Sequence, residues 1–486
     1  MTRYKAIPII QSLPTTLSSV EVCELLHNDP FCFFLDSGVD CNRLGRYSFL
    51  GCDPFLIFKN QGGRNEIRQG NSIELVRGNP FDILKTLLSK YRLITPPDLP
   101  PFMGGAVGYF AYDLKHFVEK LPSQSKDDIN VPLCFLAFYD TVIIFDHLKG
   151  KMWISSTGLP EESEHLKQIR AKTRLEELYR KLSAIKKSNT FPKFTSNKQG
   201  LIELKSNFTR DDYIHAILKA KEYIAAGDIY QVNLSQRFSA QISTPPYELY
   251  KILRALNPAP FAAYLKFGEG VIISSSPERF LRISGRSVET RPIKGTRPRG
   301  KTKVEDERLR CELLESTKDK AELIMIVDLE RNDLGRVCEY GTVSVPEIIT
   351  LEAYATVFHL VSTITGKLKE NKDQIDCIKA CFPGGSITGA PKIRSMEIID
   401  ELEPTQRKIY TGSIGYIGFN QQTDLNIVIR TMLYCGDTVH FQVGGGIVAD
   451  SDPQLEYEET LHKGKALIEA LHQGSKVVVQ PSQAII

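Results

Sequence analysis

Residues 440–465 read HFQVGGGIVADSDPQLEYEETLHKGK. The first ten are rich in β-branched and aromatic residues and predict a strand, and the apolar spacing over 455–472 predicts a helix. The glycines match the G-x-G-x-x-A turn of dinucleotide-binding folds. Four acidic residues follow where a pyrophosphate would lie: Asp450, Asp452, Glu456 and Glu458. Because their charge would repel it, the segment argues against a dinucleotide-binding fold.

The same acidic residues suit a metal ion. Glu456 and Glu459 are three positions apart, so both lie on one face of the predicted helix, with Lys463 one turn beyond. Hard oxygen ligands of this kind suit Mg²⁺. The alternative is a solvated acidic helix face paired with Lys463, and spacing alone favours it. Glu322, in AELIMIVDLERND, is either a third metal-facing group or a surface residue.

Two further residues form a pair of possible chemical importance. Glu278 follows a predicted strand in SSSPERF, and Lys294 lies sixteen positions later in RPIKGTRPRG, across a predicted hairpin whose tip is near Gly285. A carboxyl group and a lysine in a partly desolvated site can act as general acid and amine nucleophile. A cross-strand salt bridge is the more common arrangement. His359 would by itself be an ordinary buried histidine.

Composition bounds the class of protein. The chain has 486 residues, of which 42% are hydrophobic and 24% charged, so it is predicted to be globular, with several domains or one large compound domain. A net charge of +3 argues against a nucleic-acid partner. No apolar run approaches a membrane span, and the first residues lack an export signal. The ten cysteines include no C-x-x-C pair, and we expect reduced thiols in the cytoplasm.

The chain is predicted to have a mixed α+β organisation. Residues 1–187 are sheet-rich, with strands over 31–58 and 131–155 and a helix over 160–187. Residues 188–205 resemble a linker, 206–475 form a second region, and 476–486 are a C-terminal tail. Thr209 resembles the cap of a helix. Further helices are predicted over 246–256, 303–326, 373–381, 392–401 and 455–472.

Six motifs occur in an order that resembles the chorismate-utilising enzymes: SSSPERF, RPIKGTRPRG, AELIMIVDLERND, FPGGSITGAPKIRSMEIIDELEP, GSIGYIGF and GGGIVADSDPQLEYEET. The segments LDSG, RYSFLG and FMGGAVGYFAYDL also resemble component I subunits that use nitrogen from glutamine. This resemblance implies an α+β fold with two antiparallel sheets packed face to face and helices outside.

The resemblance also implies a magnesium site and roles for individual residues. Mg²⁺ would be held by Glu322 and Glu459, with Glu456 acting through water. Glu278 would protonate the departing 4-hydroxyl of chorismate, Lys294 would attack C2, and His359 would be an active-site histidine. Substrate-binding positions would be Gln231, Thr296, Thr388, Tyr416, Arg430, Gly445 and Lys463. Ser37 lies in the region where relatives bind tryptophan.

Within this family the residue at position 294 distinguishes two branches. Lysine in PIKGT is typical of aminodeoxychorismate synthase component I, which serves 4-aminobenzoate and folate synthesis, whereas anthranilate synthase component I typically has alanine. Gln231 stands where isochorismate and salicylate synthases carry a lysine. The chain has no G-x-C-x-G glutaminase elbow, so a separate glutaminase subunit is the expected ammonia source. Anthranilate synthase remains the alternative, and a silent scaffold for the glutaminase is a further one.

Overall fold

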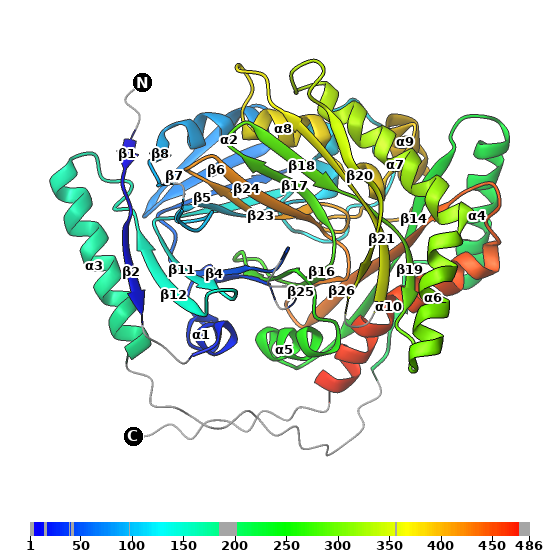
Figure 1. Cartoon of the computed structure of the whole chain (residues 1–486), viewed down its shortest axis with the longest axis horizontal. Helices are drawn as coiled ribbons and strands as arrows, with labels where there is room; N and C mark the ends of the chain where they lie inside the picture. The colour runs from blue at the N-terminus through cyan, green and yellow to red at the C-terminus, as the bar shows by residue number, and fades with distance from the viewer. Residues whose placement is uncertain are drawn as a thin grey trace.

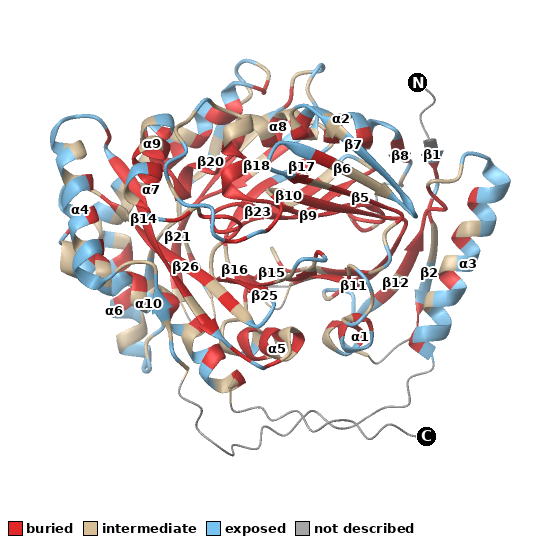
Figure 2. Cartoon of the chain, turned by 180° about the vertical axis from the view of Figure 1, so that it is seen from behind, coloured by how far each residue is buried: buried red, intermediate tan, exposed pale blue. Residues whose placement is uncertain are grey.

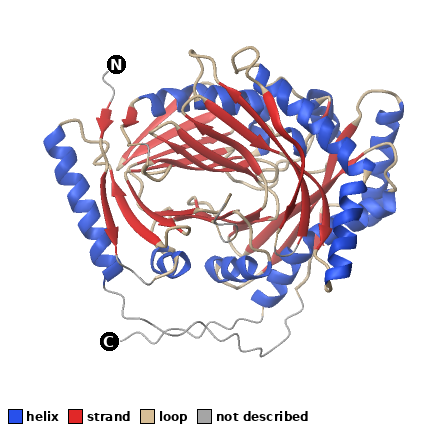
Figure 3. Cartoon of the chain, viewed as in Figure 1, coloured by secondary structure: helices blue, strands red, loops and turns tan. Residues whose placement is uncertain are grey.

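Two large antiparallel sheets face each other, and most helices lie outside them (Figures 1 and 3). The computed structural model describes residues 4–13, 17–37, 39, 43–96, 98–183, 202–354 and 357–475. The helices are α1 (Ser19–Leu26), α2 (Pro80–Ser89), α3 (Glu164–Ser183), α4 (Arg210–Ala225), α5 (Pro246–Leu256), α6 (Lys303–Glu315), α7 (Thr317–Gly335), α8 (Gln374–Cys381), α9 (Lys392–Leu402) and α10 (Pro453–Gly474). No described helix is both long and apolar enough to cross a membrane.

The first sheet has twelve strands. Its path is β19 (Ile293–Pro298), β21 (Val357–Lys367), β18 (Ser287–Arg291), β17 (Arg279–Ser284), β24 (Gln422–Ile427), β23 (Ser413–Gly418), β9 (Gly105–Phe110), β10 (Cys134–Tyr139), β5 (Leu56–Gln61), β6 (Arg64–Gln69) and β7 (Ser72–Arg77), with β20 (Ser344–Ala353) also paired to β21. Gly285 turns the hairpin between β17 and β18 at φ +60°, as its sequence position predicts.

The second sheet also has twelve strands. Its path is β13 (Lys205–Ser206), β14 (Gln231–Gln241), β26 (Thr438–Ile447), β25 (Thr431–Cys435), β16 (Val271–Ser276), β15 (Phe261–Lys266), β3 (Phe33–Asp36), β4 (Tyr47–Gly51), β11 (Thr141–Asp146), β12 (Lys151–Ser156) and β2 (Ile9–Leu13), with β22 (Gly389–Ala390) paired to β14. The short strands β1 (Tyr4–Ala6) and β8 (Tyr91–Leu93) pair in parallel apart from both sheets.

The main core lies between the two sheets, where the ribbons in Figure 2 are almost continuously buried. Strands β9, β10 and β11 are buried at every position, which explains their mostly apolar sequences. The N-terminal and C-terminal regions share both sheets, because β3 pairs with β15 and β9 pairs with β23. The linker-like segment 188–205 lies outside the described residues except for 202–205, and the tail 476–486 lies wholly outside them.

Most predicted elements are present, with one clear correction. The single helix predicted over 303–326 is two helices, α6 and α7, separated at Ser316. The Ser316 side chain accepts a hydrogen bond from the backbone N–H of Asp319, so it caps α7 instead of continuing α6. The predicted cap at Thr209 is confirmed, since its hydroxyl accepts from the Asp212 N–H at 3.1 Å. Helix α3 falls within the predicted range 160–187.

Candidate active site

Glu278 lies in the short turn between β16 and β17 and is only 5% exposed. Its backbone carbonyl accepts from the Ile427 N–H at 3.0 Å, which fixes the turn against β24. Burial raises the pKa of the carboxyl group to about 7, and the Ser386 hydroxyl and the charge of Lys294 oppose this shift only in part. Glu278 Oε1 has no hydrogen-bond partner among the described residues. The group can therefore hold a proton near neutral pH.

Lys294 lies on β19, where a bulge at Gly295 separates its pairing with Leu360 from that of Thr296 with His359. Burial lowers the pKa of Lys294, whereas the nearby carboxylates of Glu322 and Glu278 favour its charged form. Strand β19 pairs with β21 and not with β17, so Lys294 and Glu278 are not cross-strand partners. Lys294 and Glu278 interact only through their charges, without an ion pair between them in the described structure, which argues against the simple salt-bridge alternative.

His359 faces Thr296 across the same strand pair. The Thr296 Oγ1 and His359 Nδ1 atoms are 2.9 Å apart. Burial, followed by the positive charge of Arg430, lowers the pKa of His359 to about 4. The imidazole is therefore neutral at neutral pH and can donate or accept a hydrogen bond.

Three carboxylates approach one another between α7 and α10. Burial raises the pKa of Glu322, and the negative charge of Glu456 adds to the shift. The pKa of Glu456 is in turn raised by burial and by the negative charge of Glu459. Two lysines offset this repulsion: Lys463 Nζ lies 2.6 Å from Glu459, and Lys318 Nζ lies 3.8 Å from Glu456. The predicted pairing of Glu459 with Lys463 is thus present, but Glu456 is buried and not on a solvated face.

Gly445 borders this group. A Cβ atom at Gly445 would lie 3.2 Å from Glu456 Oε2 and 3.8 Å from both Glu459 Oε1 and Lys463 Nζ. Hard oxygen donors that repel one another around a space kept open by a glycine fit a divalent cation such as Mg²⁺. In the described chain no three His, Cys, Asp or Glu side chains converge as closely as metal ligands do. Binding would therefore require the carboxylates to draw together and Glu459 to release Lys463.

Buried polar atoms without partners mark the adjoining surface. Gln231 is 2% exposed, yet neither its amide nitrogen nor its amide oxygen is hydrogen-bonded within the described structure. Asn233 Oδ1 also lacks a hydrogen-bond partner there, and the Ser386 hydroxyl has no partner other than the neighbouring Glu278 carboxyl group. The Thr388 hydroxyl instead donates to the Gly384 carbonyl at 3.0 Å. Because buried polar groups are normally satisfied, this set indicates a site for a ligand rich in oxygen atoms.

Arg430 and Lys463 are held together, since Arg430 Nη1 donates to the Lys463 carbonyl at 2.7 Å. Burial lowers the pKa of Arg430, and the nearby Tyr410 and Glu459 oppose the shift. Tyr416, which the family resemblance places among the substrate-binding positions, lies apart from Arg430: its ring stacks on Phe102, with 4.6 Å between the ring centroids. Tyr410 is therefore the tyrosine that the fold brings to Arg430, and Tyr416 is not.

Tyr416 instead borders a cavity of about 80 Å³ together with Ser37. The Ser37 hydroxyl donates to the Pro260 carbonyl at 3.1 Å, and its N–H donates to the Ser48 hydroxyl at 3.0 Å. Ser37 is thus apart from Glu278 and Lys294, as expected for a separate pocket. Whether tryptophan binds there stays a prediction.

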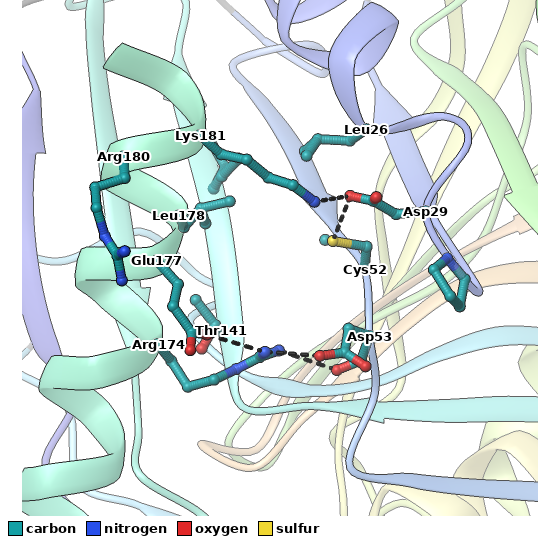
Figure 4. Close-up of a pocket in the computed structure, with 13 residues that line it drawn as sticks. Leu26, Asp29, Cys52, Asp53, Thr141, Arg174, Glu177, Leu178, Arg180 and Lys181 are labelled. Atoms are coloured by element: carbon teal, nitrogen blue, oxygen red, sulfur yellow. Dashed lines mark hydrogen bonds and ion pairs between the residues drawn. The ribbon is translucent and has the colours of Figure 1, made fainter. Parts of the chain in front are cut away.

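A larger cavity of about 470 Å³ lies between α3 and the ends of α1 and β4 (Figure 4). Two ion pairs span it, Lys181 with Asp29 and Arg174 with Asp53, at 2.6 and 2.7 Å. Its lining residues include neither Lys294 nor Glu278, His359 or the three glutamates between α7 and α10. Size alone therefore does not identify the reactive site of this molecule.

Comparison with known proteins identifies the class. The model of the family "chorismate binding enzyme" matches residues 32–469. The chain is 39% identical to anthranilate synthase component 1 of Acetivibrio thermocellus over 478 residues, covering 98% of this chain and 97% of that protein. It is 41% identical to aminodeoxychorismate synthase component 1 of Bacillus subtilis over 432 residues, covering 88% and 90%.

Solved structures of chorismate-utilising enzymes share the fold of this chain. The crystal structure of anthranilate synthase component I from Streptococcus pneumoniae TIGR4 matches with a TM-score of 0.76 and 33% identity, covering 86% of this chain and 91% of that chain. The isochorismate synthase MenF of Escherichia coli shares the fold, with a TM-score of 0.71 and 20% identity over 97% and 95% of the two chains. The chain belongs to the chorismate-binding family and is a chorismate-utilising enzyme. Its predicted fold is confirmed, whereas the names of its relatives divide between two reactions.

The environment of Gly445 gives a first prediction. Replacing Gly445 with alanine should raise the KM for chorismate about tenfold, the scale of ~1.4 kcal/mol, because the methyl group would crowd Glu456. Gly335→Ala is the matched control, since an added methyl there meets nothing within 4 Å on an exposed part of α7. Steady-state kinetics of both variants test this. An equal KM for Gly445→Ala and the parent enzyme would contradict the assignment of this space to ligand binding.

Proposed function

We propose that this enzyme is an aminodeoxychorismate synthase component I, which converts chorismate and ammonia to 4-amino-4-deoxychorismate. The observation that carries the proposal is Lys294. It stands where this branch of the family typically has lysine, and burial lowers its pKa although the nearby Glu322 and Glu278 carboxylates oppose the shift. Burial favours the neutral form of the amine, and a neutral amine is the nucleophilic form.

In the proposed reaction Lys294 is the nucleophile and Glu278 is the general acid that protonates the leaving group. The Lys294 amine forms a bond to C2 of chorismate, the ring double bonds shift, and the C4–oxygen bond breaks. Glu278 gives its proton to the departing hydroxyl, which leaves as water. The lysine adduct gives its extra proton to the Glu278 carboxylate. Ammonia then bonds to C4, the ring double bonds shift back and the C2–nitrogen bond breaks. The leaving nitrogen takes a proton from Glu278, which regenerates the Lys294 amine, and the new ammonium group on C4 returns its extra proton to Glu278. Each step is easier than direct replacement of hydroxide.

The remaining polar groups would bind and orient the substrate. We assign the substrate carboxylates to the neighbourhood of Arg430 and Lys463, and the unpartnered amide of Gln231 to a substrate oxygen. Thr296 would orient the His359 ring. Thr388 and Gly445 would shape the site. Glu322, Glu456 and Glu459 would hold Mg²⁺, which when bound would neutralise substrate negative charge.

Anthranilate synthase component I is the alternative function. Among eight relatives that are 38–41% identical to this chain, seven are named anthranilate synthase component 1 and one is named aminodeoxychorismate synthase component 1. Against it stands Lys294 in place of the alanine typical of that branch. A silent scaffold is a weaker alternative, because the acid, the lysine and the carboxylates are all present.

We further propose that ammonia comes from a glutamine amidotransferase partner. The named relatives are first components of their enzymes. The product would feed 4-aminobenzoate and folate synthesis in the cytoplasm. Free ammonium should replace the partner in vitro, since the chemistry proposed for this chain requires only ammonia.

Product analysis tests the proposed function. The purified chain is incubated with chorismate, Mg²⁺ and ammonium at mildly alkaline pH, with and without aminodeoxychorismate lyase. We expect 4-aminobenzoate only when the lyase is added. Fluorescent anthranilate without lyase would assign the chain to the alternative reaction, and unconsumed chorismate would support the scaffold. Omitting Mg²⁺ in the presence of a chelator is the control for the cation.

A further inference from the structure

Glu352 is a buried carboxylate on the strand beside the one that carries His359. It lies on β20 directly opposite His359 in the register of β20 and β21, and it is 8% exposed. Arg291 Nη2 donates to Glu352 Oε1 at 2.6 Å, and the Tyr354 hydroxyl donates to Oε2 at 2.7 Å. The Tyr354 ring meets the His359 ring edge-on, with 5.6 Å between centroids. Glu352 thus holds the tyrosine that packs against the histidine.

Arg43 reaches this carboxylate from the N-terminal region. It lies between Ser37 and β4, and its Nη1 is 2.5 Å from Glu352 Oε1. Its Nη2 donates to both carboxylate oxygens of Glu347, at 3.1 and 3.2 Å. One guanidinium therefore ties two carboxylates of β20 together. Planar, multivalent contacts of this kind fix geometry more firmly than a single ion pair.

Two arginines, Arg43 and Arg291, balance the charges of two carboxylates, Glu347 and Glu352, and this balance is lost without Arg43. Burial pushes the pKa of Glu352 upward, but the hydrogen bond from Tyr354 and the charges of Arg291 and Arg43 outweigh it and hold the pKa below its usual value. Without Arg43, Glu347 and Glu352 would share Arg291, which lies 3.6 Å from Glu347. Two buried or half-buried carboxylates with one cation would repel each other and disturb β20.

We propose that Arg43 is a positioning residue for His359: by clamping Glu347 and Glu352 it fixes β20 and the Tyr354 ring, and so keeps the imidazole against Thr296. The N-terminal region thereby contributes to the geometry of a site whose other residues come from the C-terminal region. The expected effect on turnover rests on the proposed function, because it requires His359 to act on the substrate. The effect on the His359 ring itself does not.

His359 is a spectroscopic reporter of this arrangement. The groups that face it are Thr296 and the Gly295 backbone on β19, Glu352 on β20, Tyr354 directly after β20, and Arg430 directly before β25. Burial and then Arg430 keep its pKa at about 4, and Glu352 opposes them. Loss of Arg43 leaves more negative charge opposite the ring. The pKa of His359 should therefore rise.

The test compares Arg43→Met with Arg43→Lys. Imidazole ¹⁵N signals are recorded against pH in protein labelled at its nine histidines, with His359 assigned by the signal lost in His359→Gln. In Arg43→Met we expect the His359 titration to move upward by about half a pH unit or more. We also expect kcat with ammonium to fall about five- to tenfold, with less than a twofold change in the KM for chorismate. Arg43→Lys should recover part of both effects.

Arg174→Met is the matched control. Arg174 also joins two segments by ion pairs, to Asp53 at 2.7 Å and Asp140 at 3.7 Å, but on the α3 side of the molecule (Figure 4). It should leave the His359 signals unchanged. Signals in Arg43→Met identical to those of the parent enzyme would overturn the proposal, as would equal losses of kcat in the two methionine variants. The imidazole spectra need no turnover, so they remain decisive even if the product assay assigns another reaction.

Discussion

Lys294→Ala should lower the rate of ammonium-dependent amination of chorismate by about a thousandfold or more, equivalent to ~4 kcal/mol of transition-state stabilisation. The substitution removes the amine proposed to form the bond to C2, so the reaction would lose its two-step route. Lyase-coupled formation of 4-aminobenzoate measures the loss. Intact-mass analysis provides a second measurement: the parent enzyme with chorismate and no ammonia should carry chorismate less one water, attached at Lys294.

Two control variants separate nucleophilicity from charge and from folding. Lys294→Arg keeps a positive charge but supplies no neutral amine, so it should be as inactive as the alanine variant. Lys266→Ala changes a lysine of β15 in the other sheet, which donates to the His27 and Asn28 carbonyls at 3.0 and 3.2 Å, and it should retain activity. Amination by Lys294→Ala within tenfold of the parent rate would rule out a covalent role for Lys294.

Glu278→Gln should lower kcat/KM by about 10²- to 10⁴-fold, the usual contribution of a positioned general acid. Glutamine occupies nearly the same space but has no proton to give. The pH profile provides an independent signature. The pKa of Glu278 is raised to about 7, so the protonated form needed by a general acid predominates below pH 7 and declines as pH rises. The alkaline limb of kcat/KM should therefore begin near pH 7 and disappear in Glu278→Gln.

Glu289→Gln is the matched control for Glu278→Gln. Glu289 lies on the neighbouring strand β18 and pairs with Arg279 at 2.7 Å, outside the group around Lys294. It should keep the parent pH profile and most of the parent rate. A Glu278→Gln enzyme with the same alkaline limb and a rate within a few-fold of the parent would exclude Glu278 as the acid.

The contrast between Tyr416 and Tyr410 illustrates a limit of sequence reasoning. Both tyrosines precede Arg430 in one motif-rich segment, and nothing in their spacing says which one meets the arginine. Tyr416 lies on β23, where its side chain points into the aromatic layer with Phe102, whereas Tyr410 precedes the strand and remains near Arg430. The sequence could not single out Asn233 for a related reason, because an unpartnered polar atom can be recognised only in the folded chain.

Most helices and strands and the α+β class could be predicted from the sequence alone. Its ordered motifs also carry the resemblance that points to Glu278, Lys294 and the three glutamates. These follow from local periodicity, capping residues and ordered motifs, which act over short stretches of chain. The tertiary structure decided how segments distant in sequence share the two sheets, which tyrosine joins Arg430, and that Arg43 clamps β20. Those features depend on strand pairing, burial and the balance of charges between residues far apart in sequence, such as Arg43 and Glu347, which are 304 positions apart. No local sequence pattern predicts these contacts, because nothing in the sequence around one residue indicates which distant residue it will contact in the folded chain.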